Sequence, residues 1–403
     1  MDDRDVAPDE TLLKHIFATN QPAHISIILQ NWDKCVFKAD FSGTLENRRP
    51  SCVVRLEAAE NGSSAQFATV AAMQQIAATC IPDLVPKLLQ VGIAANTRGV
   101  QFQFWVMEFA QGVTLEEGWD QMSGEDQSYV ATAVVEALEK LHSVRLSDDA
   151  VQAILGRALG EESEEILNKA AMGGPSTGFP DNGLALLTSI TQRLQLNRPF
   201  CSIEPMTDPK GLVIQSSFED LGSTTIRDSD MEQWPNEAVF CHNDLTPRNI
   251  ILQSFDAPDG NPTYKLAAII DWEAAGFYPP SYELSLQDTY LSGGNRHISF
   301  YLLLKQRMKG LVPPSPSQIA LLQAMELIFE SQQKRLSEGT NIPAHIRKRF
   351  REKLRLSRHK DPYIGWTPEA QDVPLPRFSR IDGQKLEDDV VAEMVARRQS
   401  KTK

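Results

Sequence analysis

The sequence predicts an α+β protein of two lobes, with a small antiparallel β-rich N-terminal lobe and a larger, mainly helical C-terminal lobe. Three observations support this fold class. The chain has 403 residues, which is more than one ordinary compact core contains. Strand-like patterns dominate before Gly112, and helical spacing dominates after it. Hydrophobic residues make up 41% of the chain and charged residues 23%, which is typical of a folded globular protein.

Short runs of β-branched and aromatic residues in the first part of the chain predict an antiparallel sheet. They occupy residues 24–29, 35–41, 51–57, 87–92 and 101–109. The polar stretch at residues 42–50 predicts a hairpin loop between two of these strands. Residues 64–80 are rich in alanine, with apolar positions at helical spacing. We therefore expect three strands, a helix and two strands, with the helix packed on the sheet.

Helical patterns follow, at residues 125–142 and again over residues 281–336. Between them, residues 160–235 are rich in Gly, Pro, Ser and Asp, which indicates an insertion whose elements the pattern does not specify. The basic run at residues 345–360 favours a solvated face over a specific anion site. The expected organisation is an N-terminal extension over 1–20, an N-lobe over 21–110, a C-lobe over 111–338 that includes the insertion, and a charged C-terminal extension over 339–403.

Charge and targeting signals exclude several classes of protein. The formal net charge of −13 argues against broad binding to nucleic acid or to anionic membranes. The acidic N-terminus lacks the basic and apolar parts of a signal peptide, and no apolar run approaches the ~20 residues of a membrane helix. The five cysteines are scattered and show no CxxC spacing. We expect reduced thiols in a cytoplasmic protein.

The strongest chemical signal is HNDLTPRNI at residues 242–250, followed by IIDWE at residues 269–273. Phosphoryl transfer needs a carboxylate that orients the acceptor hydroxyl and takes its proton, and oxygen ligands that hold Mg²⁺ against the phosphates. Asp244, Asn249 and Asp271 match these needs in order. The apolar strands around SFDAPDGNP would bring Asn249 and Asp271 to one end of a hairpin. An isolated Asp or Asn is more often a turn former, but the joint occurrence favours an ATP–Mg²⁺ site.

The two segments closely resemble the aminoglycoside phosphotransferase and choline kinase group, especially its large fungal branch. The resemblance implies a bilobal protein-kinase-like fold. It also implies that Asp244 is the catalytic base and that Asn249 and Asp271 are the Mg²⁺ ligands. His242 would order the catalytic loop by a hydrogen bond near the metal-binding Asp.

The same resemblance extends to segments on either side of the catalytic loop. WVMEFAQGVTLEEGW, which begins at Trp105, resembles the family's hinge. It implies that the backbone of Met107, Glu108 and Phe109 holds adenine. His142 is expected to be a structural histidine, and Glu283 an internal ion-pair partner.

The N-lobe departs from the family's pattern where the phosphates would bind. Kinase-like folds use a glycine-rich turn that lets backbone amides approach phosphates. The turn here is QNWDK, residues 30–34, which has no glycine and contains the bulky Trp32. Phosphate contact could come from Lys34 or from side-chain amides.

The second departure concerns the cation of the third strand. Arg55 stands where the family has a phosphate-binding lysine, and the helix at residues 64–80 has no acidic residue to pair with it. Thr69 occupies the place expected for the helix glutamate. Arg55 could pair with Glu57 or Glu60, meet phosphate directly, or be an ordinary surface residue of its strand.

The sequence thus predicts an ATP-dependent phosphotransferase that moves the γ-phosphoryl group of MgATP to a hydroxyl of a small metabolite or natural product. The alternative is a degenerate or repurposed kinase-fold protein that binds nucleotide or metabolite without phosphoryl transfer. The two departures in the N-lobe motivate the alternative. The presence of Asp244, Asn249 and Asp271 opposes it, because loss of catalysis should not spare all three.

Overall fold

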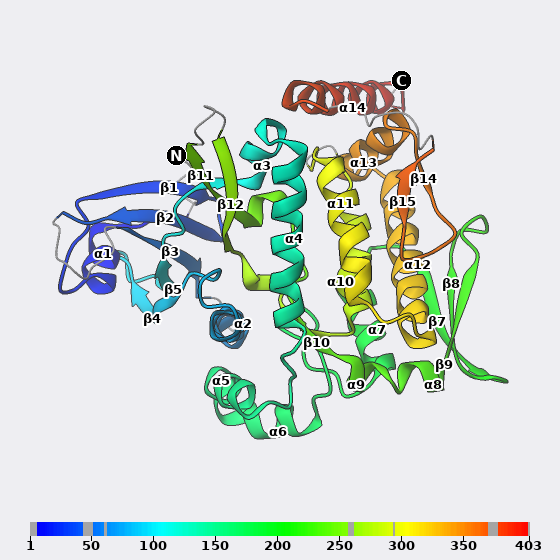
Figure 1. The fold of residues 1–403 in the computed structure, drawn as a ribbon, viewed down its shortest axis with the longest axis horizontal. Coiled ribbons are helices and arrows are strands. Elements are labelled where there is room, and N and C mark those ends of the chain that lie inside the picture. The colour runs from blue at the N-terminus through cyan, green and yellow to red at the C-terminus, as the bar shows by residue number, and fades with distance from the viewer. Residues whose placement is uncertain are drawn as a thin grey trace.

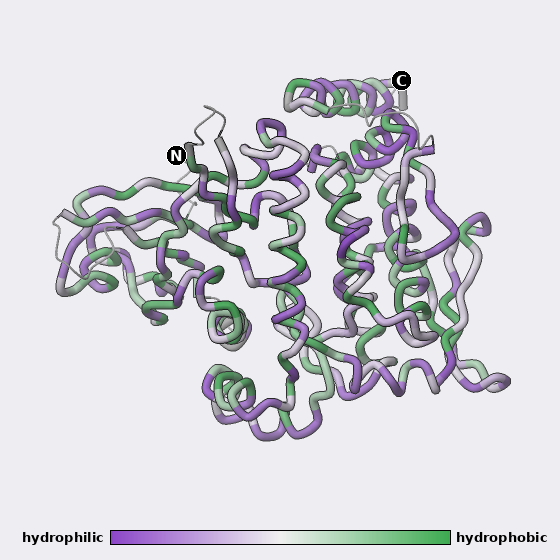
Figure 2. Tube along the Cα trace, in the orientation of Figure 1, coloured by the Kyte–Doolittle hydropathy of each residue, from purple (hydrophilic) through white to green (hydrophobic). Residues whose placement is uncertain are grey.

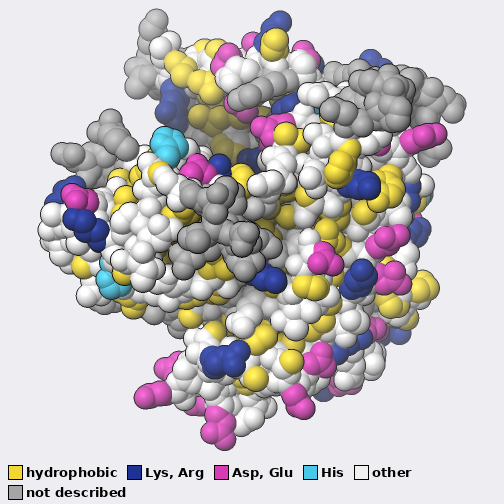
Figure 3. Space-filling model, turned by 60° about the vertical axis from the view of Figure 1, so that its left-hand side comes forward, with side chains coloured by type: hydrophobic (Ala, Val, Ile, Leu, Met, Phe, Trp, Pro, Cys, Tyr) yellow, Lys and Arg dark blue, Asp and Glu magenta, His cyan; other side chains and the backbone are white. Residues whose placement is uncertain are grey.

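The computed structural model describes residues 6–42, 51–59, 63–256, 262–292, 295–369 and 378–401. A β-rich part formed by the first third of the chain lies beside a larger helical part (Figure 1). The predicted α+β class with two lobes is therefore confirmed. On the face that carries the N-terminal sheet, charged side chains of both signs are interspersed with hydrophobic ones (Figure 3).

The N-terminal sheet has five antiparallel strands in the order β1-β2-β3-β5-β4. Its strands are β1 (His24–Gln30), β2 (Lys34–Asp40), β3 (Ser51–Ala58), β4 (Leu88–Ala95) and β5 (Gln101–Glu108). In β3, the buried Cys52, Val54 and Leu56 alternate with less buried residues, as a half-buried strand requires. Helix α1 (Glu10–Ile16) packs its apolar side chains on this face. The predicted hairpin loop lies outside the described residues, apart from its first residue, Ser42.

Helix α2 (Ser63–Cys80) joins the sheet to the helical part of the molecule. Near its start, Phe67 and Val70 pack against Trp105 of β5. Near its end, Met73 and Ile76 belong to the main core of the helical part. A helix with apolar residues on nearly all sides is stable only when it is buried in this way.

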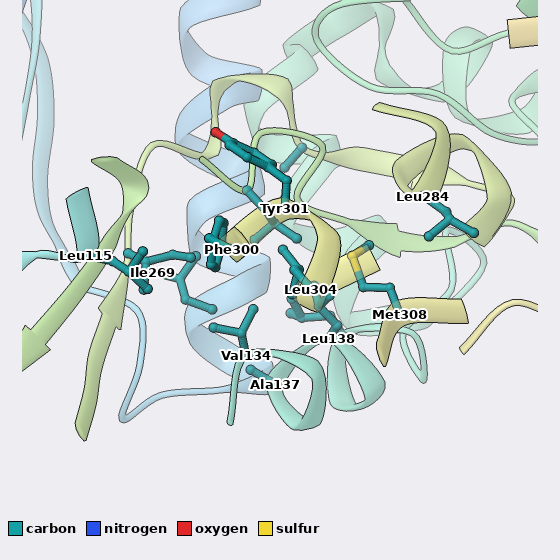
Figure 4. Close-up of a cluster of buried hydrophobic side chains, with 14 of the residues drawn as sticks. Leu115, Val134, Ala137, Leu138, Ile269, Leu284, Phe300, Tyr301, Leu304 and Met308 are labelled. Atoms are coloured by element: carbon teal, nitrogen blue, oxygen red, sulfur yellow. The ribbon is translucent and has the colours of Figure 1, made fainter. Parts of the chain in front are cut away.

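The centre of the C-lobe is a bundle around α4 and α11 (Figure 4). The helices of this part are α3 (Leu115–Gly118), α4 (Gly124–Leu141), α5 (Asp149–Leu159), α10 (Pro280–Thr289), α11 (Ile298–Met308) and α12 (Pro316–Glu338). Val134 and Leu138 of α4 pack in one cluster with Phe300 and Leu304 of α11. Helices are thus found at both places where the sequence predicts helical patterns.

Residues 160–235, to which the sequence pattern assigns no elements, contain helices and a small sheet. The helices are α6 (Ser163–Lys169), α7 (Gly183–Arg193), α8 (Asp228–Met231) and the start of α9 (Trp234–Glu237), and the sheet consists of β7 (Cys201–Thr207), β8 (Lys210–Ser216) and β9 (Ser223–Arg227). This sheet packs on α12, where Ile214 and Ile226 meet Leu321 and Ile328 in a second core. The region therefore extends the C-lobe with its own apolar cluster.

The C-terminal part packs on the helical lobe through α13 (Ile342–Lys353) and α14 (Arg380–Lys401), with the short strands β14 (Leu356–Arg358) and β15 (Trp366–Pro368) between them. Purple and green alternate along both helices in Figure 2, as expected for amphipathic helices. The basic run differs from a purely solvated face. Arg351 is only 8% exposed, lies 3.0 Å from Glu330 and covers the ring of Trp366.

Two further features concern the helices and the cysteines. Among the described helices, none has the length and apolar character needed to cross a lipid bilayer. All five cysteines are free thiols, and burial raises the pKa of Cys35, Cys52 and Cys201 to about 11. These thiols are therefore protonated near neutral pH and poorly reactive.

The bundle around α4 should be sensitive to the loss of a single apolar side chain. We expect Leu138→Ala to lower the free energy of unfolding by about 2–5 kcal/mol, because the fully buried side chain would leave a cavity. Urea denaturation followed by circular dichroism measures this change. Leu184→Ala on α7 is the matched control, since that side chain is 46% exposed and should cost less than about 0.5 kcal/mol. Equal effects of the two substitutions would contradict the placement of this core.

Candidate active site

A β-hairpin brings the two predicted metal ligands together. Strands β11 (Ile250–Asp256) and β12 (Pro262–Ile269) pair antiparallel, with the first residue of β11 opposite the last of β12. Just beyond that pair, the N–H of Ile270 donates to the carbonyl oxygen of Asn249 over 2.9 Å. Asn249 and Asp271 therefore meet at one end of the hairpin, as the sequence predicts.

Asp271 adopts a left-handed backbone conformation, with φ 65° and ψ 69°. Non-glycine residues rarely do so, and such strain is characteristic of functional sites. The next residue, Trp272, is buried, packs against the rings of Phe240 and His242, and donates from its indole nitrogen to the carbonyl oxygen of Ile269. This anchor fixes the turn while the Asp271 side chain stays 37% exposed.

His242 connects residues 242–249, here called the catalytic loop after their predicted role, to residues 269–273, here called the metal segment. Its ring is fully buried, with Nε2 3.0 Å from the carbonyl oxygen of Ile270 and Nδ1 accepting the N–H of Asp244 over 3.1 Å. These partners require a neutral ring that carries its proton on Nε2. Burial lowers the pKa of His242, in agreement with a neutral ring. The position is the one expected for a residue that orders the loop.

The carboxylate of Glu283 holds the start of the catalytic loop from α10. It is wholly buried, and its Oε1 accepts the backbone N–H groups of both His242 and Asn243 over 2.8 Å. Its other oxygen lies 3.4 Å from Nε2 of His142. Asn243 itself has a positive φ of 63°, and the hydroxyl of Tyr290 donates to its carbonyl oxygen. Glu283 thus binds mainly backbone amides, in addition to the internal partner expected from the sequence.

Asp244 and Asn249 are joined directly. The amide nitrogen of Asn249 donates to the backbone oxygen and to the Oδ2 atom of Asp244, each over 2.8 Å. Both hydrogens of this amide are then used, which leaves Oδ1 as the Asn249 atom that can face a cation. Asp244 keeps a fixed orientation at the wall of the main cleft.

Arg55 lies between the sheet and the metal segment, and its side chain is 13% exposed. The guanidinium donates to Glu57 over 2.6 Å and to Glu273 over 2.7 Å, and it lies 3.7 Å from Asp271. Burial opposes its charge, but Glu57 and Glu273 outweigh burial and raise the pKa of Arg55. The alternative that Arg55 is an ordinary surface residue of its strand is wrong, because these contacts bury its side chain. Of its two predicted partners, Glu57 is confirmed and Glu60 lies outside the described residues.

Glu273 is the site residue that sequence reasoning missed. It contacts Arg55 and also lies 3.8 Å from the ammonium of Lys34. The available signal was its position two residues after Asp271 in the IIDWE segment, on the same short turn. Glu273 supplies the carboxylate that α2 lacks, from the opposite lobe.

The turn between β1 and β2 is closed by a side chain. Oδ1 of Asn31 accepts the backbone N–H groups of Asp33 and Lys34 over 3.2 and 2.7 Å. Trp32 at its tip is 70% exposed. These two amides are therefore already engaged within the turn, whereas a glycine-rich loop presents such amides to phosphate.

The predicted hinge residues Met107, Glu108 and Phe109 lie at and just beyond the end of β5. The N–H of Glu108 donates to the carbonyl oxygen of Lys87, and the ammonium of Lys38 covers the ring of Phe109. None of the three hinge residues is among the described residues that line the main cleft. The structure therefore does not bring them into the cavity that contains Asp244 and Arg55.

The main cleft has a volume of about 770 Å³ and lies between the N-terminal sheet and the C-lobe. One end is formed by residues of β2, β3, α2 and the β1–β2 turn, including Lys34 and Arg55. The other end is formed by α7, α10 and α12. Asp244, Glu273 and Ala274 lie on its wall as well.

Comparisons with known proteins agree in part with this geometry. The sequence profile described as the phosphotransferase enzyme family matches residues 42–287, which include Arg55, the catalytic loop and the metal segment. No curated protein matches the chain. Similar solved structures include the GDP and kanamycin complex of APH(2")-IIia (13% identity, 95% of this chain and 98% of that chain covered, TM-score 0.44) and the gentamicin complex of APH(2")-IIa (13%, 89% and 99%, TM-score 0.41).

The hydrogen bonds that Glu283 accepts should be needed to keep the catalytic loop folded. We expect Glu283→Ala to lower the free energy of unfolding by about 2–6 kcal/mol, because two buried N–H groups would lose their acceptor at a cost of about 1–3 kcal/mol each. Glu283→Gln should cost less, since its amide oxygen can still accept. Urea denaturation of both variants measures the difference. Glu139→Ala, on the exposed side of α4, should change stability by less than about 0.5 kcal/mol, and a Glu283→Ala value that small would contradict this role of Glu283.

Proposed function

Because the chain belongs to the phosphotransferase enzyme family, we propose that it transfers the γ-phosphoryl group of MgATP to a hydroxyl of a small metabolite or natural product. The observation that supports this proposal most is the convergence of Asp244, Asn249 and Asp271 at the end of one hairpin, beside a cleft of about 770 Å³. A carboxylate and oxygen ligands in one place are what phosphoryl transfer requires of a protein.

In this proposal Asp244 is the catalytic base. Its carboxylate orients the acceptor hydroxyl towards the γ-phosphorus and takes the proton as the oxygen attacks. Asn249 keeps the carboxylate in one orientation through its two hydrogen bonds. His242 and Glu283 are positioning residues, since they hold the backbone of the loop and lie behind it.

The donors at the hairpin end fit a divalent cation. Burial and the charge of Glu273 raise the pKa of Asp271 to about 6, even though Arg55 opposes the shift. Repulsion from the carboxylate of Glu273 thus adds to the effect of burial on Asp271, and a bound Mg²⁺ would favour the ionised form of Asp271. Asp271 and Oδ1 of Asn249 would hold the ion. Mg²⁺ would neutralise charge on the phosphates during transfer.

Arg55 and Lys34 are the proposed phosphate-binding cations. Both face the segment that carries Asp271, and both are tied to Glu273. Glu57 and Glu273 hold the guanidinium from two sides, so its orientation is fixed before nucleotide binds. The planar guanidinium of Arg55, held in this way, can donate its remaining N–H groups to phosphate oxygens. By the family resemblance, Met107 to Phe109 would hold adenine, although this requires a nucleotide that extends beyond the main cleft.

One observation favours the alternative of a repurposed protein that binds nucleotide or metabolite without phosphoryl transfer. Asn31 occupies the amides of Asp33 and Lys34, which are the groups expected to cradle phosphates. Phosphate binding then depends on side-chain charges. Weak nucleotide binding is compatible with both functions, so binding and turnover must be measured separately.

MgATP should stabilise the folded protein. A ligand at about 100 times its Kd adds roughly 2.7 kcal/mol, which gives a clear rise in Tm. We expect this rise with MgATP in millimolar amounts and a smaller rise with ATP plus chelator, because Asp271 and Asn249 need the metal to tolerate the phosphates. Differential scanning fluorimetry measures both.

Asp271→Asn should remove the magnesium-dependent part of this stabilisation, whereas Asp83→Asn, at an exposed turn, should leave it intact. The magnesium-dependent part should also shrink between about pH 8 and about pH 5, because protons compete with the metal below the raised pKa of Asp271. A folded protein that shows no shift with MgATP at any of these conditions would favour the repurposed reading.

Asp244→Asn should reduce turnover by roughly 10²–10⁴ while MgATP binding stays nearly unchanged, since a general base acts on the reaction and not on nucleotide affinity. ADP release with an identified acceptor, measured beside the fluorimetric Tm shift, separates the two effects. Asp83→Asn again serves as the control. Full activity of Asp244→Asn would show that the base is a different residue.

A further inference from the structure

The helical end of the main cleft is apolar or uncharged except for one cation. The described residues that form it come from the segment before α7, from α7, from α10 with its following residue, and from α12. They are Ser176, Thr177, Ile190, Arg193, Leu194, Tyr282, Leu286, Thr289, Tyr290, Met325 and Phe329. The acidic residues of the lining, Asp33, Glu57, Asp244 and Glu273, all belong to the nucleotide end or to the catalytic segments.

Arg193 ends α7 and has no hydrogen-bond or ion-pair partner within the described part of the chain. The other cations of the cleft differ in this respect, because Lys34 and Arg55 are both tied to Glu273. The Arg193 side chain is exposed and lines the same cleft as Asp244. An unpaired guanidinium thus shares one cavity with the proposed catalytic base.

An unpaired guanidinium beside apolar side chains favours some acceptors over others. A guanidinium binds a carboxylate through two parallel hydrogen bonds, which fixes both position and orientation. Leu194, Leu286 and Phe329 are half-buried and offer apolar surface in the same lining, and covering such surface favours binding. A cationic polyol would meet the repulsion of Arg193, and no carboxylate lines this end of the cleft among the described residues.

We propose that the acceptor is a hydroxy acid with an apolar body, and that Arg193 binds its carboxylate while its hydroxyl faces Asp244. The proposal deepens the proposed function and rests on it for the transfer step. In that step the acceptor oxygen bonds to the γ-phosphorus of ATP, and the bond from this phosphorus to the bridging oxygen breaks. The hydroxyl proton passes to Asp244, and ADP leaves with the electrons of the broken bond. The product is a phosphate ester that keeps its carboxylate.

The test uses the full chain with two hydroxy acids, ω-hydroxydecanoate and mandelate, each compared with its primary amide, and with kanamycin as a cationic polyol. ADP release and product mass report transfer, and calorimetry reports binding with and without a non-hydrolysable MgATP analogue. We expect at least one acid to bind and react about 10-fold or more better than its amide. Arg193→Gln should raise the KM for that acid by about 10- to 100-fold, leave the amide unchanged, and be partly rescued by Arg193→Lys.

Arg198→Gln is the matched control, because this exposed arginine follows α7 but does not line the cleft, and it should change nothing. Acids that are no better than their amides, or a preference for kanamycin, would overturn the inference while MgATP binding keeps the proposed function intact. A raised KM for ATP in Arg193→Gln would also overturn it, by making Arg193 a nucleotide ligand. If an acid binds through Arg193 but MgATP never binds, the ligand would be a hydroxy acid as proposed, and the proposed phosphoryl transfer would be contradicted.

Discussion

The buried carboxylate of Glu283 is the contact on which the geometry of the site depends. One of its oxygens accepts two consecutive backbone amides, and the second of these residues, Asn243, has a left-handed conformation that open chain would not keep. The same turn sets the position of His242, whose ring binds the residue before Asp271. A single acceptor on α10 therefore fixes both the catalytic loop and its distance from the metal segment. A buried N–H group without an acceptor costs free energy. Hydrogen bonds to Glu283, in addition to packing, therefore hold this arrangement.

The sequence predicted the parts of the molecule that chemistry or periodicity constrains. The convergence of Asp244, Asn249 and Asp271 could be predicted because residue type, order and an intervening strand pair leave few other arrangements, while their chemical roles stay predictions. The five strands and α2 could be found because alternation and helical spacing are strong in them. The sheet of β7, β8 and β9 could not, since Gly, Pro and Ser dilute its pattern and its stability comes from packing on α12. Side-chain partners across the lobes, such as Glu273 for Arg55, depend on tertiary structure, which no local pattern encodes.

The missing glutamate of α2 has a physical replacement. A buried guanidinium needs carboxylate partners, since the cost of removing it from water is otherwise large. Arg55 obtains them from its own strand, at Glu57, and from the opposite lobe, at Glu273. Its position is therefore linked to the turn that carries Asp271, whereas an α2 glutamate would have linked it to the helix. The N-terminal sheet and the metal segment are joined by this pair, and its geometry depends on how the lobes are closed.

The charges of the cleft differ between its ends, and this difference constrains what can bind. Lys34 and Arg55 lie against the carboxylates of Glu57, Asp271 and Glu273, and Asp33 and Asp244 line the same cleft, so carboxylates outnumber cations on this side. Burial is the largest cause of the raised pKa of Asp271, and the charges of Glu273 and Asp244 add to it. In the proposed function, a divalent cation would offset this excess of carboxylates when a nucleotide binds. The helical end differs, because among the described residues its lining carries one charged side chain, that of Arg193, for which the same residues provide no partner. In the proposed complex the acceptor carboxylate would lie at Arg193 while the acceptor hydroxyl meets the γ-phosphate beside Asp244, so the two substrates could react while their negative groups stay apart.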